Sequence, residues 1–540
     1  MSEQSLSTLD LAIAGTLVLL NPAPRFESID PAIQAQLLPT QLLGMTNDGL
    51  VTFKHIAGRD GTQLVPDLAT SLPLPADGGR SYTFRLRAGI RYSTGVPVRA
   101  ADIRRGLERG FKVHGAARSF YSGIVGADRC MRAPERCDLS RGIVTDDHRR
   151  TITFNLTSPD PDLPYKLALP YAYAIPAGTP DRDVGTQPVP ATGPYMIAGY
   201  RPGAELRLAR NPEFHEWSRT AQPDGYADEI VWKLGVRPEA GTAAIIDGRA
   251  DWMQSIGQAL PAARLRDLER RYPSQLHANP LMQTDYMVFN VNVPPFNDVR
   301  VRRALNYALD RRAITRLFGA SGARPTCQVL PPQMPGYAPI CPYTSRPRSD
   351  GKWNAPDVAT ARHLIADSGT RGMKVVVWDT PEPGTFLEEG RATVTLLRRL
   401  GYRASLRLVA DNVYARRSGN SRLRVQISSG GWSADYPSPS SFIKLKLSCG
   451  AFKPATDYNH NAGGFCDPAL DRQAERAQRL QSRRPQRAAA LWTRIERQLV
   501  DQAVWLPMVT PNTTDLVSRR VGNYQFHPLW GLLVDQLWVR

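Results

Sequence analysis

Residues 82–107 read YTFRLRAGIRYSTGVPVRAADIRRGL and contain both kinds of element from which the fold is built. Ser81–Leu86 alternates apolar and polar residues, which predicts a strand with one buried face. Ala101–Phe111 carries apolar residues at helical spacing. The acidic Asp102 stands near its start, where the positive end of a helix dipole favours a carboxylate. A strand that leads into a helix in this way is typical of an α/β unit.

The same alternation of strands and helices continues along the chain. Further strands are predicted at Thr16–Leu20, Glu205–Ala209, Glu229–Gly235 and Met373–Trp378. Further helices are predicted at Gly241–Ile246, Val299–Phe318, Val358–Asp367 and Ala488–Gln502. No internal repeat is evident. Because strands separated by helices assemble into α/β units, we expect an α/β protein with mixed sheets.

The length and composition indicate a large globular protein. With 540 residues the chain exceeds the size at which one core stops growing, so two or three packed units are expected. Hydrophobic residues make up 42% and charged residues 22%, values that are ordinary for a soluble globular protein. This composition argues against a disordered or fibrous chain.

The chain is strongly basic, with a net charge of +18 from 9 Lys and 59 Arg against 50 acidic residues. Such a charge suggests nucleic-acid binding. However, no run of five or six basic residues interleaves with aromatic residues, so we expect no nucleic-acid partner. The densest pairs, Arg302-Arg303, Arg311-Arg312 and Arg398-Arg399, lie in predicted amphipathic helices, where we expect solvated faces. A general preference for Arg and association with an anionic membrane surface explain the charge.

Six cysteines fall into three close pairs. They are Cys130 with Cys137, Cys327 with Cys341, and Cys449 with Cys466. Six cysteines allow 15 connectivities, but none of these pairs has the C-x-x-C spacing of zinc or redox sites, and no histidine pair accompanies them. Sequential disulfides are the favoured interpretation, and they indicate an oxidising, extracytoplasmic location.

The amino-terminal segment does not supply a clear export signal. Leu11–Leu20 is apolar like the core of a signal peptide, but Glu3 and Asp10 precede it without any Lys or Arg. The sequence shows neither an A-x-A cleavage site nor a lipidation cysteine there, and the segment is too short to cross a bilayer. We interpret Thr16–Leu20 as the first buried strand. Two explanations stay open: the chain has been trimmed, or it is one part of a longer protein.

Several segments, in order, resemble one family. They are Ser28–Pro31 (SIDP), Leu64–Ala69 (LVPDLA), Tyr82–Leu107, Ala191–Tyr195 (ATGPY) with Arg210–Pro212 (RNP), Asn290 with Pro295–Arg302 (PFNDVRVR) and Ala308–Arg311 (ALDR), Gly431–Pro437 (GWSADYP), and Val517–Gly522 (VSRRVG). None is diagnostic alone, but their order and spacing cover almost the whole chain. The chain resembles the solute-binding proteins of ABC transporters, family 5, which bind oligopeptides and dipeptides.

The resemblance implies a bilobal fold of the periplasmic-binding-protein type. It is the type II, three-domain peptide-binding variant, with mixed sheets and a hinge. Domain I would be discontinuous, at about 1–45, 190–285 and 500–540. Domain II would be an insertion at about 46–189, and domain III would cover about 286–499. Gly193-Pro194 and Asn211-Pro212 also make sense as structural turns, in which the glycine permits backbone geometry closed to other residues.

Asp435 is the main candidate for ligand binding. An aspartate in a Gly- and Pro-rich loop beside Trp432 and Tyr436 suits capture of a cationic α-ammonium group in a dry cleft. The resemblance implies this salt bridge for the aspartate of the motif. The alternative for Asp435 is an Asx-turn that caps the loop. Trp432 could equally pack in the core, and Tyr436 could equally lie at the rim of the site.

The residue for the ligand carboxylate is less clear. The resemblance implies an arginine before the helix that follows Met373–Trp378, but Leu387 stands at that position. Arg391, one helical turn away, could replace it, or it could be a solvated helix residue. This departure puts a strict dipeptide specificity in doubt. The resemblance also implies that the Cys449–Cys466 loop supports the rim of the cleft.

The sequence contains no motif of an enzyme or of a cofactor site. Walker A, H-E-x-x-H, G-x-S-x-G and G-x-G-x-x-G are all missing, and the eight histidines are spread singly. We therefore expect no enzyme, no cofactor and no metal site. The expected protein is an extracytoplasmic monomer that captures a peptide-like ligand between two lobes for an ABC-transporter permease. The alternative is the ligand-sensing domain of a larger membrane-associated regulatory protein.

Overall fold

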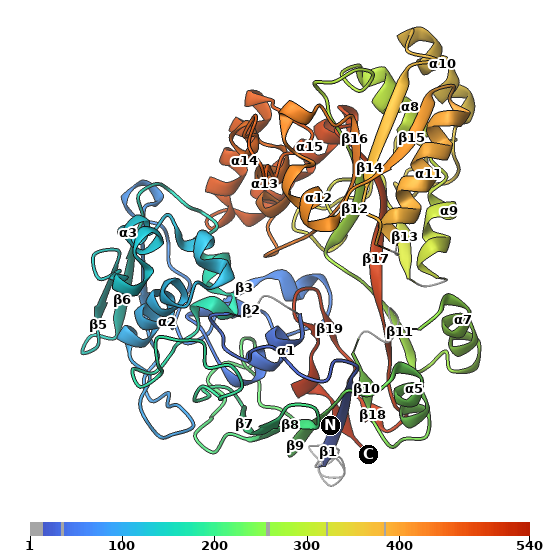
Figure 1. The fold of residues 1–540 in the computed structure, drawn as a ribbon. Coiled ribbons are helices and arrows are strands. Elements are labelled where there is room, and N and C mark those ends of the chain that lie inside the picture. The colour runs from blue at the N-terminus through green and yellow to red at the C-terminus, as the bar shows by residue number, and fades with distance from the viewer. Residues whose placement is uncertain (1–14, 34–36, 255–259, 320–321, 383–384) are drawn as a thin grey trace, which may run out of the picture. The chain divides into compact units, whose positions relative to one another are not determined.

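The computed structural model of the protein describes residues 15–33, 37–254, 260–319, 322–382 and 385–540. Residues 11–14 of the apolar Leu11–Leu20 segment lie outside this part. The chain forms two compact units (Figure 1). Unit 1 comprises Met1–Leu260, Tyr272–His277 and Asp515–Arg540, and unit 2 comprises Pro261–Arg271 and Ala278–Thr514. The further division of the chain into three domains stays a prediction.

Unit 1 contains a five-stranded mixed sheet of order β10-β1-β9-β8-β7. Its strands are β1 (Thr16–Asn21), β7 (Tyr195–Arg201), β8 (Glu205–Arg210), β9 (Glu229–Leu234) and β10 (Trp252–Met253). β1 runs parallel to β9 and β10, whereas β8 is antiparallel to β7 and β9. The helices of this unit include α1 (Leu37–Thr46), α2 (Ala100–Lys112), α3 (Ala127–Arg132), α4 (Leu163–Leu167) and α5 (Pro238–Ile246). The predicted first buried strand is confirmed.

The stretch 82–107 forms the strand and the helix that its pattern predicts. β4 (Ser81–Arg85) pairs antiparallel with β6 (Thr151–Asn155), which also pairs with β5 (Ile143–Asp146). Asp102, in the first turn of α2, accepts hydrogen bonds from the Arg99 N–H at 2.9 Å and the Tyr92 hydroxyl at 3.1 Å. These bonds fix the start of α2, as expected for an acidic residue near a helix amino terminus.

Two of the family-like motifs in unit 1 are explained by buried contacts. Asp30, in Ser28–Pro31, forms a two-pronged ion pair with Arg109 of α2, and both side chains are fully buried. Gly193 does not adopt a left-handed conformation; instead, a Cβ there would lie 2.5 Å from the carbonyl oxygen of Met45. The predicted turn therefore needs glycine because of close packing, and not because of its backbone angles.

Unit 2 contains a larger mixed sheet of order β11-β17-β12-β16-β14-β15, with β13 also paired to β17. Its strands are β11 (Leu276–Pro280), β12 (Gln283–Phe289), β13 (Ala323–Pro325), β14 (Lys374–Asp379), β15 (Arg403–Leu408), β16 (Ile427–Ser433) and β17 (Trp505–Leu516). β14 is parallel to both β15 and β16, and β12 is antiparallel to β16. The mixed α/β class that the sequence predicts is confirmed.

Helices cover both faces of this sheet. The helices of this unit include α7 (Ala262–Arg271), α8 (Val299–Ala308), α9 (Arg311–Thr315), α10 (Val358–Ser368), α11 (Thr385–Arg399), α12 (Asp411–Arg417), α13 (Ser440–Leu447), α14 (Pro468–Gln481) and α15 (Pro485–Asp501). Met287 of β12 joins a core with α8, α10 and α11, whereas its neighbour Tyr286 joins a second core with α13, α14 and α15. Adjacent strand residues thus face opposite layers, and Figure 1 shows these two groups of helices on either side of the sheet.

The predicted long helix Val299–Phe318 is wrong, because it breaks into α8 and α9. Leu309 leaves the helical conformation, and the Asp310 side chain accepts a hydrogen bond from the Ala313 N–H and begins α9. Arg302 and Arg311 also differ from the solvated residues that we expect, since they are only 5% and 0% exposed. Arg302 donates to the carbonyl oxygens of neighbouring segments, including that of Phe296 at 2.8 Å.

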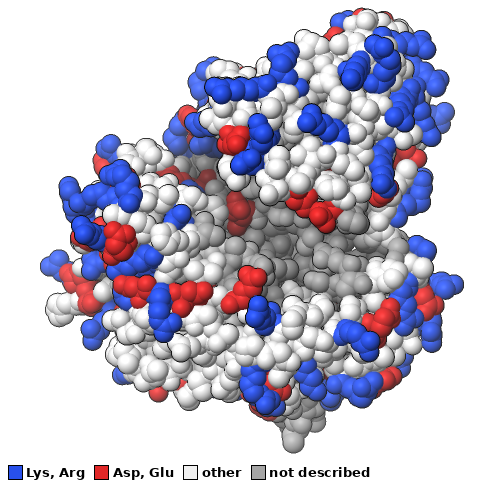
Figure 2. Space-filling model, in the orientation of Figure 1, with Lys and Arg blue, Asp and Glu red and all other residues white. Residues whose placement is uncertain are grey.

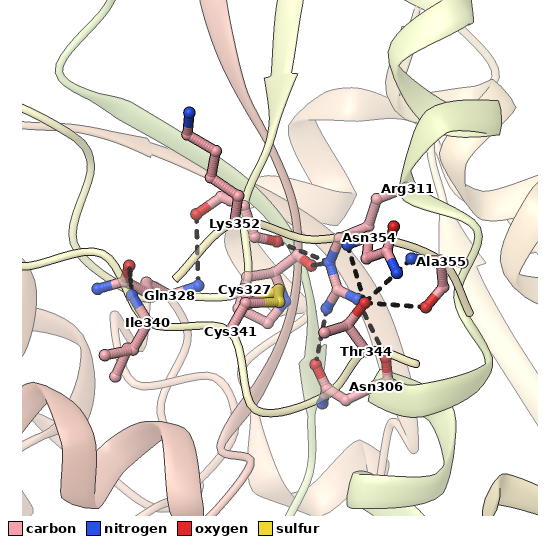
Figure 3. Close-up of a disulfide and its surroundings, with 12 residues drawn as sticks. Asn306, Arg311, Cys327, Gln328, Ile340, Cys341, Thr344, Lys352, Asn354 and Ala355 are labelled. Atoms are coloured by element: carbon pink, nitrogen blue, oxygen red, sulfur yellow. Dashed lines mark hydrogen bonds between the residues drawn. A yellow bond between two sulfur atoms is a disulfide. The ribbon is translucent and has the colours of Figure 1, made fainter. Parts of the chain in front are cut away.

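Arg311 lies beside the Cys327–Cys341 disulfide (Figure 3). Its guanidinium donates to the carbonyl oxygens of Asn306, Thr326 and Pro507 at 2.7–3.0 Å, and to the Asn306 side chain. Burial lowers the pKa of Arg311 to about 9. The cation is therefore held by carbonyl dipoles that belong to α8, the segment after β13 and β17.

The structure contains the three predicted disulfides. They are Cys130–Cys137 in unit 1, and Cys327–Cys341 and Cys449–Cys466 in unit 2. Each joins cysteines that are neighbours in the sequence, so the predicted sequential connectivity is confirmed. The bridges close loops with sequence separations of 7, 14 and 17 residues. They therefore pin local loops and do not join distant elements.

The surface is basic but mixed in charge. Figure 2 shows Lys and Arg side chains over the visible face of both units, many of them beside an Asp or Glu. Exposed ion pairs of this kind include Arg207 with Glu205 at 2.8 Å and Arg300 with Asp298 at 2.7 Å. Among the described helices, none combines the length and the apolar character that a membrane crossing requires.

Candidate functional site

The candidate site begins where β16 ends in unit 2. β16 runs antiparallel to β12, with Trp432 opposite Thr284, and the Ala434 N–H still donates to the Met282 carbonyl. Asp435 is the first residue beyond this last bond. It therefore lies past the carboxyl end of β16, which is parallel to β14. In open α/β sheets, ligands bind outside the carboxyl ends of the strands.

The Asp435 carboxylate is half-buried and has no direct partner among the described residues. No hydrogen bond joins it, and no Lys, Arg or His nitrogen lies within 4 Å of it in the part of the chain that the structure describes. Burial raises the pKa of Asp435 to about 6, and the nearby Lys446 opposes this rise. The alternative of an Asx-turn would need a hydrogen bond to this carboxylate, so the described contacts give it no support. A carboxylate of this kind can accept hydrogen bonds from a cation.

Trp432 and Lys446 contact each other near Asp435 and form one wall of the candidate site. The Lys446 Nζ, on α13, lies 3.7 Å from the centroid of the Trp432 ring, a cation–π contact. The Trp432 indole N–H donates to the Ser441 carbonyl oxygen at 2.9 Å, which ties the ring to α13. Burial lowers the pKa of Lys446 to about 8, against the effect of Asp435. The structure thus adds Lys446 to the site; its spacing in the sequence gives no signal of this role.

Tyr436 continues the same loop into the core. Its side chain is 7% exposed, and its carbonyl oxygen accepts hydrogen bonds from the Ser438 N–H and the Ser441 hydroxyl. These bonds lead directly into α13. The predicted contact of Tyr436 with a ligand stays a prediction, because the observed bonds define only how its backbone holds the loop.

Arg391 lies on α11 and not in the Trp432–Tyr436 loop. Its guanidinium pairs with Glu388 at 2.6 Å, and 57% of its side chain is exposed. Leu387, which occupies the position where the resemblance implies an arginine, is 7% exposed and packs inward. Among the described residues, no hydrogen bond or ion pair joins Arg391 to Trp432, Asp435 or Tyr436. Its role with a ligand carboxylate stays a prediction.

The Cys449–Cys466 disulfide follows α13 directly. The Cys449 N–H donates to Asp471 of α14 at 3.0 Å, and the buried Asn461 amide donates to the carbonyl oxygens of Ser448 and Phe465. The bridge and these bonds hold the loop between α13 and α14. Because α13 carries Lys446, this loop supports one wall of the candidate site.

No metal site is indicated in the described part of the chain. Over those residues, no group of three or more His, Cys, Asp or Glu side chains has the arrangement needed to hold a metal ion. The residues of the candidate site are a carboxylate, an indole ring and a lysine, from Asp435, Trp432 and Lys446.

Comparisons with known proteins identify the family. The sequence model of "Bacterial extracellular solute-binding proteins, family 5 Middle" matches residues 63–454. The peptide transport periplasmic protein SapA of Salmonella typhimurium is 26% identical, over 78% of this chain and 75% of SapA. The periplasmic oligopeptide-binding protein OppA of Escherichia coli is 24% identical, over 82% of this chain and 79% of OppA.

Solved structures agree with this result. The clavulanic acid biosynthesis oligopeptide binding protein 2 has a TM-score of 0.83 and 26% identity, over 98% of this chain and 96% of that chain. The unliganded open form of the murein tripeptide binding protein MppA has a TM-score of 0.80 at 21% identity, over 98% of both chains. The bilobal periplasmic-binding-protein fold is therefore confirmed. This chain belongs to the bacterial extracellular solute-binding proteins, family 5.

Proposed function

We propose that the protein captures a peptide with a free α-amino group between its two lobes and delivers it to the permease of an ABC transporter. The observation that carries this proposal is the Asp435 carboxylate, which is half-buried beyond the end of β16 without a direct partner among the described residues. A ligand ammonium would supply the missing hydrogen-bond donors. Trp432 would pack against the adjoining part of the ligand.

An extracytoplasmic location agrees with the proposal. The related SapA and OppA carry the word periplasmic in their names, and three disulfides persist only in an oxidising compartment. We also propose that the protein is a monomer, that it works at the cell surface or in the periplasm, and that it associates with a membrane surface. The basic surface would favour contact with anionic lipid.

The proposed protein binds its ligand without chemical turnover. Its family consists of binding proteins. The alternative of a sensing domain is not favoured by the comparisons, whose names describe binding and transport. Mass spectrometry of a peptide recovered after long incubation with the protein should show an unchanged mass. A cleaved peptide would contradict this part of the proposal.

The Asp435→Asn variant tests the binding role directly. A hydrogen bond to a charged group contributes about 1.5–3 kcal/mol, so the variant should bind a free-amino peptide about ten- to a hundredfold more weakly. The N-acetylated form of the same peptide should bind wild-type protein and variant alike. Isothermal titration calorimetry measures both affinities.

Asp411→Asn is the matched control, because it removes an exposed carboxylate from α12 of the same unit. It should leave both affinities unchanged. Equal losses for the free-amino and the acetylated peptide in Asp435→Asn would remove Asp435 from the ammonium role. If no peptide of two to six residues bound the wild-type protein, the proposed function itself would be overturned.

A further inference from the structure

Three buried carboxylates of unit 2 lie together near the carboxyl ends of the neighbouring strands β14 and β16. Asp379 is the last residue of β14, Asp285 belongs to β12, and Glu389 is in the second turn of α11. Their exposed fractions are 0%, 1% and 0%. Asp285 and Asp379 are the single acidic residues of their strands, whereas Glu389 follows the acidic Glu388 in α11. The fold brings the three side chains together.

Two glycines show how closely these carboxylates pack against the neighbouring backbone. Gly390 follows Glu389, and a Cβ there would collide with the Asp379 Oδ2 atom. A Cβ at Gly431 would lie 2.8 Å from the Asp285 Oδ1 atom and 2.9 Å from the ring of Phe386. The carboxylates of β14 and β12 thus lie directly against the backbones of α11 and β16.

Several oxygens of this group accept no hydrogen bond from the residues that the structure describes. They are the Oδ2 atom of Asp379 and both carboxylate oxygens of Glu389. The other oxygens are partly satisfied: Asp379 Oδ1 accepts from the Ser429 hydroxyl at 2.8 Å, and Asp285 Oδ1 accepts from the Gln283 amide at 2.7 Å. A buried acceptor without a donor is costly, and a buried carboxylate without a cation is more so.

The described part of the chain supplies no cation that neutralises the group. Among the described residues, no Lys, Arg or His forms an ion pair with Asp285, Asp379 or Glu389. Burial raises the pKa of Asp379 to about 6, and burial together with the two aspartates raises the pKa of Glu389. A raised pKa means that a proton neutralises much of this charge, because the described residues supply no cation that would do so.

The position of the group points to the ligand. Asp379 is the last residue of β14, and its carboxylate accepts a hydrogen bond from Ser429 of the parallel strand β16. Ser429 lies six residues before Asp435 in the chain. Six extended residues span about 20 Å, and an extended peptide covers about 3.3–3.6 Å per residue. A short peptide held at Asp435 can therefore reach the group. The Phe386 ring, 39% exposed, and the buried Asp285 carboxylate both lie beside the backbone of Gly431.

We infer that Asp285, Asp379 and Glu389 form a second subsite, which takes the cationic side chain of an arginine or lysine residue in the bound peptide. This inference rests on the proposed function, since it names the class of peptide that the same protein prefers. A guanidinium or ammonium brings several donors to the unpaired oxygens of Asp379 and Glu389. A metal ion does not fit, because no group of described residues has a metal-holding arrangement.

The test compares charged and neutral forms of one ligand. Free-amino peptides of two to six residues are made with arginine at one position or with citrulline, which has nearly the same shape but no charge. Isothermal titration calorimetry should show wild-type protein binding the best arginine peptide at least tenfold more tightly than its citrulline form. Glu389→Gln should reduce this ratio to about threefold or less.

The control is Glu388→Gln, which removes the same charge from the preceding residue of α11. Glu388 is exposed and pairs with Arg391, so the arginine-to-citrulline ratio should remain that of the wild type. Asp379→Asn is a second variant and should reduce the ratio as Glu389→Gln does. Its thermal unfolding, measured beside the others, confirms that each variant is folded.

Each outcome separates the two proposals. Equal affinities of wild-type protein for arginine and citrulline peptides would overturn the subsite and leave the proposed function intact. The same holds if the ratio is high but Glu389→Gln and Asp379→Asn both leave it unchanged. If neither form bound at any length, the proposed function would fail and the subsite with it.

Discussion

At the scale of single residues, two opposite charges lie near each other beyond β16 without forming an ion pair. Burial raises the pKa of Asp435 to about 6 and lowers the pKa of Lys446 to about 8. Each residue therefore favours its charged form less than it would in water, despite its neighbour. A ligand ammonium that reaches Asp435 would complete an interaction that Lys446, held over the Trp432 ring, does not make.

The Lys446→Gln variant should shift the pH dependence of ligand binding. Lys446 lowers the pKa of Asp435, so its removal should raise that pKa above about 6. The ammonium site needs the ionised carboxylate, and affinity is lost as the pH falls through this pKa. Calorimetry with a free-amino peptide, from about pH 5 to about pH 8, should therefore show a higher midpoint in the variant.

Lys444→Gln provides the control for this measurement. Lys444 lies on the same helix but donates to Gln478 of α14 at 2.8 Å. Its loss should leave the midpoint of binding where it is in the wild type. Identical midpoints for Lys446→Gln and wild-type protein would show that Lys446 does not influence the carboxylate that binds the ligand.

Part of the site could be predicted from the sequence. Asp435 and Trp432 stand together in one short loop, so local composition is enough to mark them as candidates. Lys446 could not be found in this way, because its place over Trp432 depends on how α13 packs. Asp379 and Glu389 belong to the consecutive elements β14 and α11, whereas Asp285 belongs to β12, which lies much earlier in the chain. Nothing local distinguishes them from ordinary acidic residues.

At the scale of elements, strands with strong apolar patterns were predictable, whereas the break between α8 and α9 was not. The amphipathic pattern continues through Leu309 and Asp310, so it predicts one helix. The break is stabilised by the Asp310 side chain and by Arg311, whose donors satisfy carbonyl oxygens of distant segments. Such long-range hydrogen bonds leave no periodic signal in the sequence.

The Cys449–Cys466 bridge should stabilise unit 2 more than the Cys130–Cys137 bridge stabilises unit 1. In the chain-entropy model, loops with separations of 17 and 7 residues contribute about 3 and about 2 kcal/mol. Paired Cys→Ser variants measured by denaturant unfolding should show these losses. The ligand affinity should fall only when Cys449 and Cys466 are replaced, because their loop supports the wall that carries Lys446. A wild-type affinity in that variant would contradict this support.

At the scale of the whole molecule, both units contain buried carboxyl groups with raised pKa values. Burial raises the pKa of Asp48 to about 7 and of Asp515 to about 6 in unit 1, and of Glu496 to about 7 in unit 2. Glu496 accepts the N–H groups of Val329 and Leu330, so its role is structural. Asp379 and Glu496 each have one oxygen without a donor among the described residues, but Asp379 differs from Glu496 because it lies close enough to another acid, Glu389, to raise the pKa of that residue.

The Asp379→Asn variant should change how stability depends on pH. A carboxyl whose pKa is raised on folding contributes stability below its unfolded pKa of about 4, and this stability is lost as the pH rises through its folded value of about 6. Asparagine does not ionise, so the variant does not lose this stability as the pH rises. Without ligand it should therefore gain about 1–2 kcal/mol relative to wild type between about pH 4 and about pH 8.

Denaturant unfolding at several pH values measures this difference. Asp411→Asn, the exposed control, should follow the wild type throughout. A saturating arginine peptide should abolish the gain, because its cation stabilises the ionised Asp379 in the wild type only. Parallel stability curves for Asp379→Asn and wild type would show that Asp379 does not ionise in this range.

The bonds of Arg311 also govern the order in which unit 2 can be completed. The carbonyl oxygen of Pro507 belongs to β17, which follows Arg311 by almost two hundred residues and lies between β11 and β12 in the sheet. Until the ribosome has made β17, the sheet lacks an inner strand and the buried guanidinium lacks one acceptor. The sheet of unit 2 in a nascent chain can therefore be completed only when synthesis is nearly finished.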